Sequence, residues 1–335
     1  MIIHPTSVYS EHFSLRDMFR TACRLDVLAL KPGNVNVESP GHGMTANDFL
    51  LSADVSASCI SDGSLGLGER IFYAANATHN NVGCNTNLGI LLLVAPLFSA
   101  FQTRYQGEGL ISSLQRTLSC LSKDDAIWTY RAIRIARPGG LGSSDRHDVF
   151  SEPTVSLLEA MKEAELRDRI AFQYTHNFKD ILEDGRNVFI NSRKHWGDDS
   201  KAMSMTYLHY LTSSPDSHIL RKHGSYTAIN TQSLAAEYAS KIRDCKSWPC
   251  IHDFLSELDR IFKSSGINPG TSADLTVATW IADSLLNIEE KNRANKNLRN
   301  NSLFLLKRLF GRKTSGQPMN DSALAVNLNL SSLFA

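Results

Sequence analysis

LGILLLVAPLF, residues 88–98, is the longest apolar run of the chain. It has about half of the ~20 apolar residues that a membrane-spanning helix needs, so we interpret it as a helix buried in a protein core. The polar segment HNNVGCNTNLG (79–89) leads directly into it. Unpaired backbone N–H groups and the helix dipole both favour negative charge at such a helix start, so this junction is a candidate anion site.

Helical periodicity continues on both sides of this run. Between Ser14 and Leu30, apolar residues recur at three- and four-residue steps, with Ser14 as the predicted N-cap. Thr45 followed by Asp48 forms a capping-box-like start for the next helix. The same pattern predicts further helices over 68–78, 88–98, 123–136, 153–174, 200–211, 225–243, 251–264 and 273–287. No segment sustains an alternation of period two, so we predict an all-α fold class in a single large helical domain.

The composition indicates a globular protein that acts through a local site. Hydrophobic residues make up 42% of the chain and charged residues 21%, which is enough apolar surface for a sizeable core. The formal charge of +1 provides no global field to attract nucleic acid or an acidic membrane, so an anionic ligand needs a local cluster of charge. We therefore expect neither nucleic acid nor a membrane as a partner.

The cysteines and the N-terminus predict a cytoplasmic protein. The 6 cysteines are scattered without a CxxC pair, which is typical of reduced thiols and argues against a zinc site. The N-terminal segment MIIHPTSVYSEHF has neither the basic nor the apolar region of a signal peptide.

Residues 291–313 differ from the rest because they are rich in Lys and Arg and contain no acid. A solvated basic appendage, a phosphate or nucleic-acid contact and an amphipathic surface helix around SLFLLKRLF are all compatible with this pattern. The first is favoured because basic tails are common. We expect an all-α catalytic domain over 1–288 and a basic C-terminal appendage, partly ordered, over 289–335.

Polar residues gather in loops at the ends of the predicted helices, where functional groups are often found. The clusters are KPGN (31–34), His42 with Asp48, NTNLG (85–89), residues 137–148 and NPGTSAD (268–274). Each has a structural alternative. KPGN can be a helix stop, and NPGTSAD can be a helix start with Thr271 or Ser272 as the cap and Asp274 in the first turn.

Several aspartates are candidate ligands of a Mg²⁺ ion. Mg²⁺ prefers a few carboxylates together with substrate phosphates. The candidate ligands are Asp148, Asp168, Asp216 and Asp274. The chain has no HExxH, GxSxG or post-strand GxGxxG motif, so the residues alone predict a helical protein with several anion-binding loops and no specific reaction.

Taken together and in order, these clusters resemble the triphosphoribosyl-dephospho-CoA synthase family. KPGNV and INPGTSADL are the most specific matches, and they lie far apart in the chain. The matching segments are LALKPGNVN (28–36), GHGMTANDFLLSA (41–53), VGCNTNLGILLLVAPL (82–97), PDSHILRKHG (215–224) and SSGINPGTSADLTVAT (264–279).

The resemblance implies an all-α enzyme that uses ATP and 3′-dephospho-CoA. Members of the family form 2′-(5″-triphosphoribosyl)-3′-dephospho-CoA and release adenine, and the product is the precursor of the prosthetic group of citrate lyase and malonate decarboxylase acyl carriers. Breaking the ribosyl C1′–N bond builds positive charge on the sugar and negative charge on adenine. Such a site needs a carboxylate near C1′, a proton donor for the base and cations on the triphosphate.

The resemblance also implies roles for individual residues. Lys31 and the helix start at NTNLG would hold phosphates. The predicted catalytic residues are Asp274 and three candidates for the base that deprotonates the acceptor hydroxyl, His42, Asp48 and Asp54. The predicted nucleotide-binding residues are Lys31, Gly33, Asn34, Asn85, Thr86, Asn87, Gly89, Asn268, Gly270 and Ser272. The predicted Mg²⁺ ligands are Asp216 and Asp274.

The chain departs from the family's best-known members at NTNLG, where they carry a Thr-His-Lys-Gly-like stretch. The alternatives are therefore ribosyl or phosphoribosyl transfer in another cofactor pathway, such as that of a one-carbon-carrying pterin, and a helical protein that binds a nucleotide without turnover. Catalysis requires Lys31, Asn87 and Asp274 to converge on one pocket. Both a monomer and a homodimer are compatible with the sequence.

Overall fold

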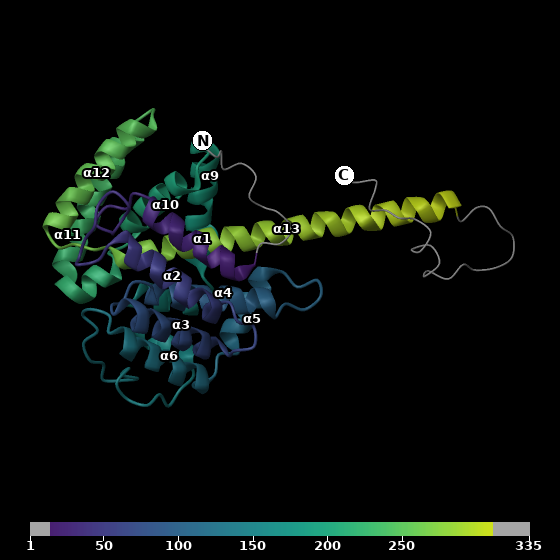
Figure 1. Ribbon diagram of the computed structural model, residues 1–335, viewed down its shortest axis with the longest axis horizontal. Coiled ribbons are helices and arrows are strands. Elements are labelled where there is room, and N and C mark those ends of the chain that lie inside the picture. The colour runs from purple at the N-terminus through teal and green to yellow at the C-terminus, as the bar shows by residue number, and fades with distance from the viewer. Residues whose placement is uncertain (1–13, 311–335) are drawn as a thin grey trace. The chain divides into compact units, whose positions relative to one another are not determined.

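Helices form the architecture of the described chain (Figure 1). The computed structural model describes residues 14–310, and the side chains of all of these except 297 and 299–310. Within this range there is no β-strand, and Gly41 and Met44 form an isolated antiparallel bridge. The predicted all-α fold class is therefore confirmed.

The helices follow one another as α1 (Leu15–Leu28), α2 (Ala46–Ile60), α3 (Leu67–Val82), α4 (Leu88–Gln102), α5 (Leu110–Ser119), α6 (Lys123–Ala136), α7 (Leu157–Ala164), α8 (Arg169–Thr175), the π-helix η1 (Asp180–Gly185), α9 (Arg186–Trp196), α10 (Asp199–Ser213), α11 (Ser217–Arg243), α12 (Trp248–Ser264) and α13 (Gly270–Phe310). No helix of the described range is both long and apolar enough to cross a membrane. The chain divides into two compact units, Met1–Leu286 and Asn287–Ala335. Residues 311–335 of the predicted appendage lie outside the described residues.

Local capping explains where several helices begin. The Ser14 hydroxyl accepts a hydrogen bond from the Asp17 backbone N–H, so it caps α1 as the sequence predicts. The Asp48 carboxylate accepts a hydrogen bond from the Thr45 backbone N–H at 2.7 Å, which confirms the capping box of α2.

The predicted long helix over 153–174 is wrong. The structure has two short helices instead, α7 and α8. A capping box between Ser156 and Glu159 starts α7 after Pro153, and the Asp168 carboxylate caps α8 by accepting from the Ile170 and Ala171 N–H groups. Capping side chains therefore override the continuous apolar periodicity of this segment.

Helix α4 and the first turns of α13 are buried on all sides. Leu91, Leu93 and Phe98 of α4 have no exposed surface, and the same holds for Val277 and Ile281 of α13. A helix that is apolar all round belongs in a core, as predicted for residues 88–98. The helix predicted over 273–287 begins earlier, at Gly270, so Asp274 lies beyond the first turn.

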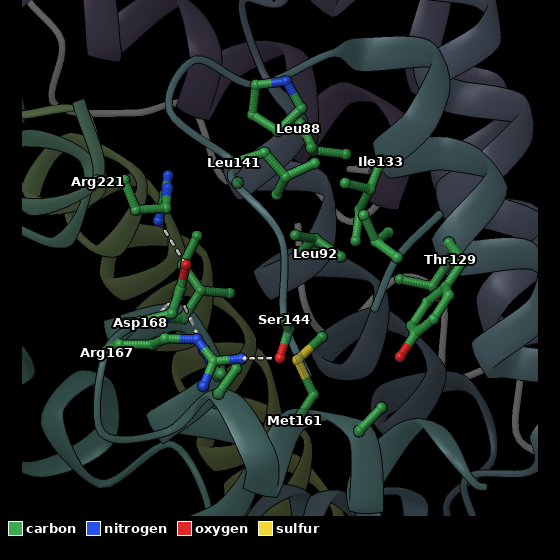
Figure 2. Close-up of a pocket in the computed structure, with 18 of the residues that line it drawn as sticks. Leu88, Leu92, Thr129, Ile133, Leu141, Ser144, Met161, Arg167, Asp168 and Arg221 are labelled. Carbon is green, nitrogen blue, oxygen red and sulfur yellow. Dashed lines mark hydrogen bonds and ion pairs between the residues drawn. The ribbon is translucent and has the colours of Figure 1, made fainter. Parts of the chain in front are cut away.

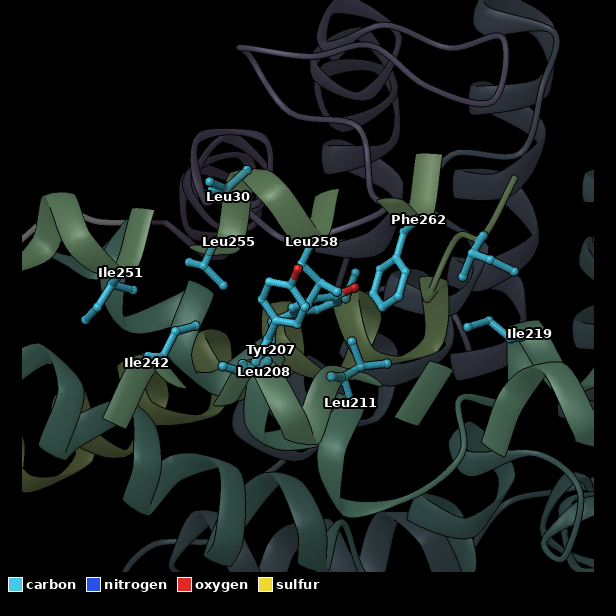
Figure 3. Packing of buried hydrophobic residues seen from close by; sticks show 14 of the residues in the cluster. Leu30, Tyr207, Leu208, Leu211, Ile219, Ile242, Ile251, Leu255, Leu258 and Phe262 are labelled. Carbon is cyan, nitrogen blue, oxygen red and sulfur yellow. The ribbon is translucent and has the colours of Figure 1, made fainter. Parts of the chain in front are cut away.

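A cluster of buried apolar residues supports the loop that contains KPGN. Helices α10, α11 and α12 contribute most of its members, and Figure 3 shows Tyr207, Leu258 and Phe262 packed together. The Tyr207 hydroxyl donates a hydrogen bond to the Pro32 carbonyl at 2.5 Å. The Gly33 N–H donates to the Asp259 carboxylate at 2.8 Å. KPGN is therefore a buried, hydrogen-bonded loop that follows the end of α1 at Leu28.

The predicted state of the cysteines is wrong for one pair. Cys245 and Cys250 form a disulfide, with their Cα atoms 5.8 Å apart. Cys245 follows the end of α11 and Cys250 lies in the first turn of α12, so the short connection between these helices brings the thiols together. Cys23, Cys59, Cys84 and Cys120 are free thiols.

Candidate active site

Two adjoining cavities lie in the first unit. The larger has a volume of about 330 Å³ and the smaller about 90 Å³. They share five lining residues, Asn85, Leu88, Gly89, His218 and Asp274. Side chains at this junction can therefore contact molecules bound in either cavity.

The smaller cavity is polar and is built from the segments that the sequence singles out. Lys31, Asn87 and Asp274 all line it, so the convergence required for catalysis is met. Lys31 is 1% exposed, and its Nζ lies 2.9 Å from the Asp26 carboxylate and 2.8 Å from the Asp26 carbonyl oxygen. Lys31 therefore forms a buried ion pair inside the protein, beside the cavity.

Asp274 is the central carboxyl of the junction. A Cβ atom on Gly89 would lie 2.0 Å from an Asp274 carboxylate oxygen, so the carboxyl packs directly on the backbone at the start of α4. Burial raises the pKa of Asp274 well above its ordinary value, and the nearby carboxylates of Asp26 and Asp216 raise it further. A raised pKa favours the protonated form of Asp274, which is the form that can act as an acid.

Apolar side chains from several helices form the larger cavity. Figure 2 shows Leu92 of α4, Ile133 of α6 and Met161 of α7 around the same space, with Leu141 from the loop 137–149. This loop is held in place because the Arg134 guanidinium donates a hydrogen bond to the Val149 carbonyl at 2.6 Å. The larger cavity therefore has a preformed apolar interior.

The loop 137–149 also packs closely on α11. Gly140 has a φ of +73°, and a Cβ at this position would lie 2.5 Å from the Arg221 carbonyl oxygen. Tyr130 of α6 donates a hydrogen bond from its hydroxyl to the His147 carbonyl at 2.7 Å. These contacts join the loop to two walls of the cavity.

Basic side chains surround His218 at the junction. Burial lowers the pKa of His218 to about 4, and the positive charges of Arg221 and Lys222 lower it further. His42 and His223 act on this pKa in the same direction. His218 is therefore a neutral imidazole at neutral pH, next to a local cluster of cations.

Three helix N-termini meet at the same place. Asp216 caps α11, because its carboxylate accepts hydrogen bonds from the His218 and Ile219 N–H groups. Its other oxygen accepts at 2.8 Å from both the N–H and the hydroxyl of Ser272, in the first turn of α13. The start of α4 lies against α13 at Gly89. The positive ends of these helix dipoles favour a bound anion.

Comparison with known proteins identifies the family. The model of the family described as ATP:dephospho-CoA triphosphoribosyl transferase matches residues 12–293. The chain belongs to this family. The predicted family and its enzyme class, a transferase with ATP and dephospho-CoA as substrates, are therefore confirmed.

A solved structure of similar fold agrees with this family. It is a crystal structure of a protein assigned as a triphosphoribosyl-dephospho-CoA synthase from Archaeoglobus fulgidus. The sequences are 21% identical, the match covers 70% of this chain and 97% of the other, and the TM-score is 0.53. At this identity the likeness concerns the fold. No curated protein matches the sequence.

Most of the residues predicted to bind the nucleotide in this transferase line the smaller cavity. They are Lys31, Asn34, Asn85, Thr86, Asn87, Gly89, Asn268 and Gly270. Gly33 and Ser272 line neither cavity, and each holds part of the wall through the backbone hydrogen bonds described above. The roles of all these residues stay predictions.

The three candidates for the base do not line either cavity. His42 lies nearby, with its Nε2 atom 2.8 Å from the Gly33 carbonyl oxygen. Asp48 is engaged in the capping box of α2. Asp54 is mostly exposed and pairs with Arg20 at 3.0 Å. The structure therefore does not bring these three side chains together with Asp274.

The two predicted Mg²⁺ ligands, Asp216 and Asp274, are both buried near the junction of the cavities. Both carboxylate oxygens of Asp216 accept hydrogen bonds from N–H or hydroxyl groups, and burial raises the pKa of Asp274 above its ordinary value. Among the described residues, no group of three or more His, Cys, Asp or Glu side chains could hold a metal ion. The metal role of Asp216 and Asp274, which was predicted together with substrate phosphates, stays a prediction.

His218, Arg221 and Asp26 are site residues that were not predicted from the sequence. His218 and Arg221 lie within PDSHILRKHG, which resembles the family, and their spacing of three places them on one helix face. That spacing, next to Asp216 at the start of the helix, could have indicated that His218 and Arg221 belong to the site. Asp26 gave no signal, because its position on α1 is compatible with a solvated surface acid.

Proposed function

We propose that the two cavities form one active site, in which the enzyme transfers the triphosphoribosyl group of ATP to the 2′-hydroxyl of 3′-dephospho-CoA and releases adenine. The observation that carries this proposal is that both cavities share the acid Asp274 and the neutral imidazole of His218. A transfer between two substrates needs such a junction, because the bond that breaks and the bond that forms involve the same carbon, C1′ of the ribose.

The two shared side chains supply opposite proton transfers. As the 2′-hydroxyl oxygen attacks C1′, the C1′–N9 bond breaks and its electron pair goes to adenine. Asp274 donates its proton to adenine, and His218 accepts the proton of the 2′-hydroxyl. The enzyme returns to its starting state when the imidazolium passes a proton, directly or through water, to the Asp274 carboxylate.

Arg221 and Lys222 explain how ATP prepares His218 for this role. Their positive charges help to lower the pKa of the imidazole in the free enzyme. A triphosphate at this basic cluster, next to three helix N-termini, offsets these charges and makes His218 a stronger base. Binding of the donor therefore precedes activation of the acceptor.

Mg²⁺ fits this proposal as an ion that ATP brings on its phosphates, since Mg²⁺ in nucleotide sites is held largely by substrate oxygens and water. A cytoplasmic location stays a proposal; four cysteines are free thiols, whereas Cys245 and Cys250 form a disulfide.

The test is adenine release, measured by chromatography, from purified protein with Mg²⁺ and ATP in the presence and absence of 3′-dephospho-CoA. We expect release that depends on the acceptor, with one triphosphoribosyl product formed per adenine. Release without the acceptor would indicate hydrolysis by water, and no release in either mixture would contradict the proposed pairing of ATP with 3′-dephospho-CoA.

A further inference from the structure

Apolar side chains from four helices line part of the larger cavity, beside polar and charged residues of the loop 137–149, α7 and the N-cap of α8. Leu92, Ile133, Met161 and Ile170 line it, and each comes from a different helix. Small-molecule pockets are typically apolar with a few polar groups, and sulfur of Met makes favourable contacts with aromatic rings. At about 90 Å³, the smaller cavity is both more polar and less roomy.

Two polar atoms of residues in this wall have no hydrogen-bond partner among the described residues, the Nε of Arg221 and the hydroxyl of Thr129. Thr129 of α6 lines the cavity and is fully buried, and its hydroxyl forms no hydrogen bond with the described residues. In contrast, the buried hydroxyls of Thr206, Thr276 and Thr279 each donate to the carbonyl four residues earlier at 2.8 Å. An unmade hydrogen bond of a buried hydroxyl is costly, so a ligand that supplies a partner is favoured.

The polar end of the larger cavity faces the junction. Asp274, His218 and Arg221 line the larger cavity, and the first two also line the smaller one. Figure 2 shows Leu92 and Ile133 away from Arg221. A nucleotide with its base among the apolar side chains and its phosphates at the cations would therefore have its ribose near the acid.

From these observations we infer that the larger cavity is a subsite for adenine, with the Thr129 hydroxyl as its hydrogen-bonding group. This inference rests on the proposed function, in which Asp274 protonates the departing adenine. ATP and 3′-dephospho-CoA both carry an adenine ring, so either substrate could place its purine in this cavity. The junction favours the adenine of ATP, because that ring leaves from the carbon next to Asp274.

Two half-buried alanines allow the cavity to be filled without crowding the core. Ala160 and Ala164 lie one turn apart on α7, line the cavity and are partly exposed. Ala164→Leu places a larger side chain in the adenine subsite and keeps a good helix former. Ala236→Leu, at an exposed position of α11 outside both cavities, is the matched control.

The first readout is binding of free adenine to the intact protein, by equilibrium dialysis. We expect adenine to bind about tenfold more weakly to Ala164→Leu than to the wild type or Ala236→Leu, because the added side chain occupies its space. Thr129→Val should also weaken adenine binding, and Thr129→Ser should retain it. Unchanged adenine binding in both Ala164→Leu and Thr129→Val overturns the inference.

The second readout identifies which adenine occupies the cavity. A raised KM for ATP in Ala164→Leu assigns the subsite to the donor, and a raised KM for 3′-dephospho-CoA assigns it to the acceptor; either result supports an adenine subsite. Wild-type protein that releases no adenine from ATP contradicts the proposed function, whereas adenine binding still tests the subsite. The two failures are therefore distinguishable.

Discussion

The two cavities differ in how their walls are made. The smaller one is lined by polar loops and helix starts, and its buried charges are matched inside the protein, as in the pair of Lys31 and Asp26. The larger one is lined by apolar side chains of α4, α6, α7 and α8 together with the ion pair of Arg221 and Asp168, and the buried hydroxyl of Thr129 has no partner among the described residues. A polar motif that stands out in the sequence can therefore stabilise the structure of a site, while ordinary apolar residues shape the pocket that binds the ligand.

Asp274 belongs to both cavities, so replacing it gives the largest expected effect. Asp274→Asn keeps the size of the side chain but removes the proton that goes to adenine. We expect kcat for adenine release to fall by about 10³-fold, within the range for loss of a general acid. Adenine should still bind, since the larger cavity is intact.

Thermal unfolding followed by circular dichroism provides the control for Asp274→Asn. The melting temperature should not fall, because the substitution removes a buried carboxyl that lies close to Asp26 and Asp216. A variant that turns over normally would exclude Asp274 as the acid. If Asp274→Asn unfolds, the role of Asp274 is structural and its assignment as the acid is wrong.

The fold could be predicted from the sequence because the pattern of apolar residues carries it. The apolar run of α4 and the cap at Ser14 were both recognised, since a helix start and a buried helix depend on neighbours in the chain. The break between α7 and α8 was missed because Asp168 caps α8 within an apolar pattern that remains helical throughout. The pairing of Cys245 with Cys250 was missed because it depends on how two helices turn.

The candidate site could be predicted only in part. The segments around Lys31, Asn87 and Asp274 contain Gly, Asn and Pro, so they are visible as loops, and they do converge. Leu92 and Met161 look like ordinary core residues, because an apolar side chain facing a cavity has the same local pattern as one facing another helix. Only the three-dimensional packing separates these two situations.

The second prediction concerns the buried pair beside the smaller cavity. Lys31→Met leaves Asp26 buried without its partner, so we expect a loss of about 3 kcal/mol in the free energy of unfolding, measured by urea denaturation. The double variant Asp26→Asn with Lys31→Met should recover most of this loss. If Lys31 also holds a phosphate, the double variant will fold but show a raised KM for ATP.

The close contact between Gly89 and Asp274 allows a test of how strongly kcat depends on the position of the Asp274 carboxyl. Gly89→Ala places a methyl group 2.0 Å from the present position of an Asp274 oxygen, so the carboxyl must move. Misplacing a catalytic group by about 1 Å can cost ~10²-fold, and we expect a loss of that order in kcat.

Gly68→Ala is the matched control, because its Cβ would lie 2.6 Å from the Asp125 carbonyl oxygen and outside both cavities. It should lower the melting temperature while the folded fraction keeps its kcat. Equal loss of kcat per folded molecule in the two glycine variants would contradict a special role for the junction.

The smallest expected effect is a shift in pH dependence at the polar end of the larger cavity. Proton acceptance requires neutral His218, so kcat/KM falls as the pH falls through the imidazole pKa of about 4 in the free enzyme. Lys222→Met removes a positive charge that lowers this pKa, so the acid limb of the pH profile should move to higher pH. Lys194→Met is the control, because Lys194 is exposed on α9 and is not among the groups that act on the pKa of His218. An acid limb that stays in place in Lys222→Met would mean that another group sets it, and the assignment of His218 as the base would be wrong.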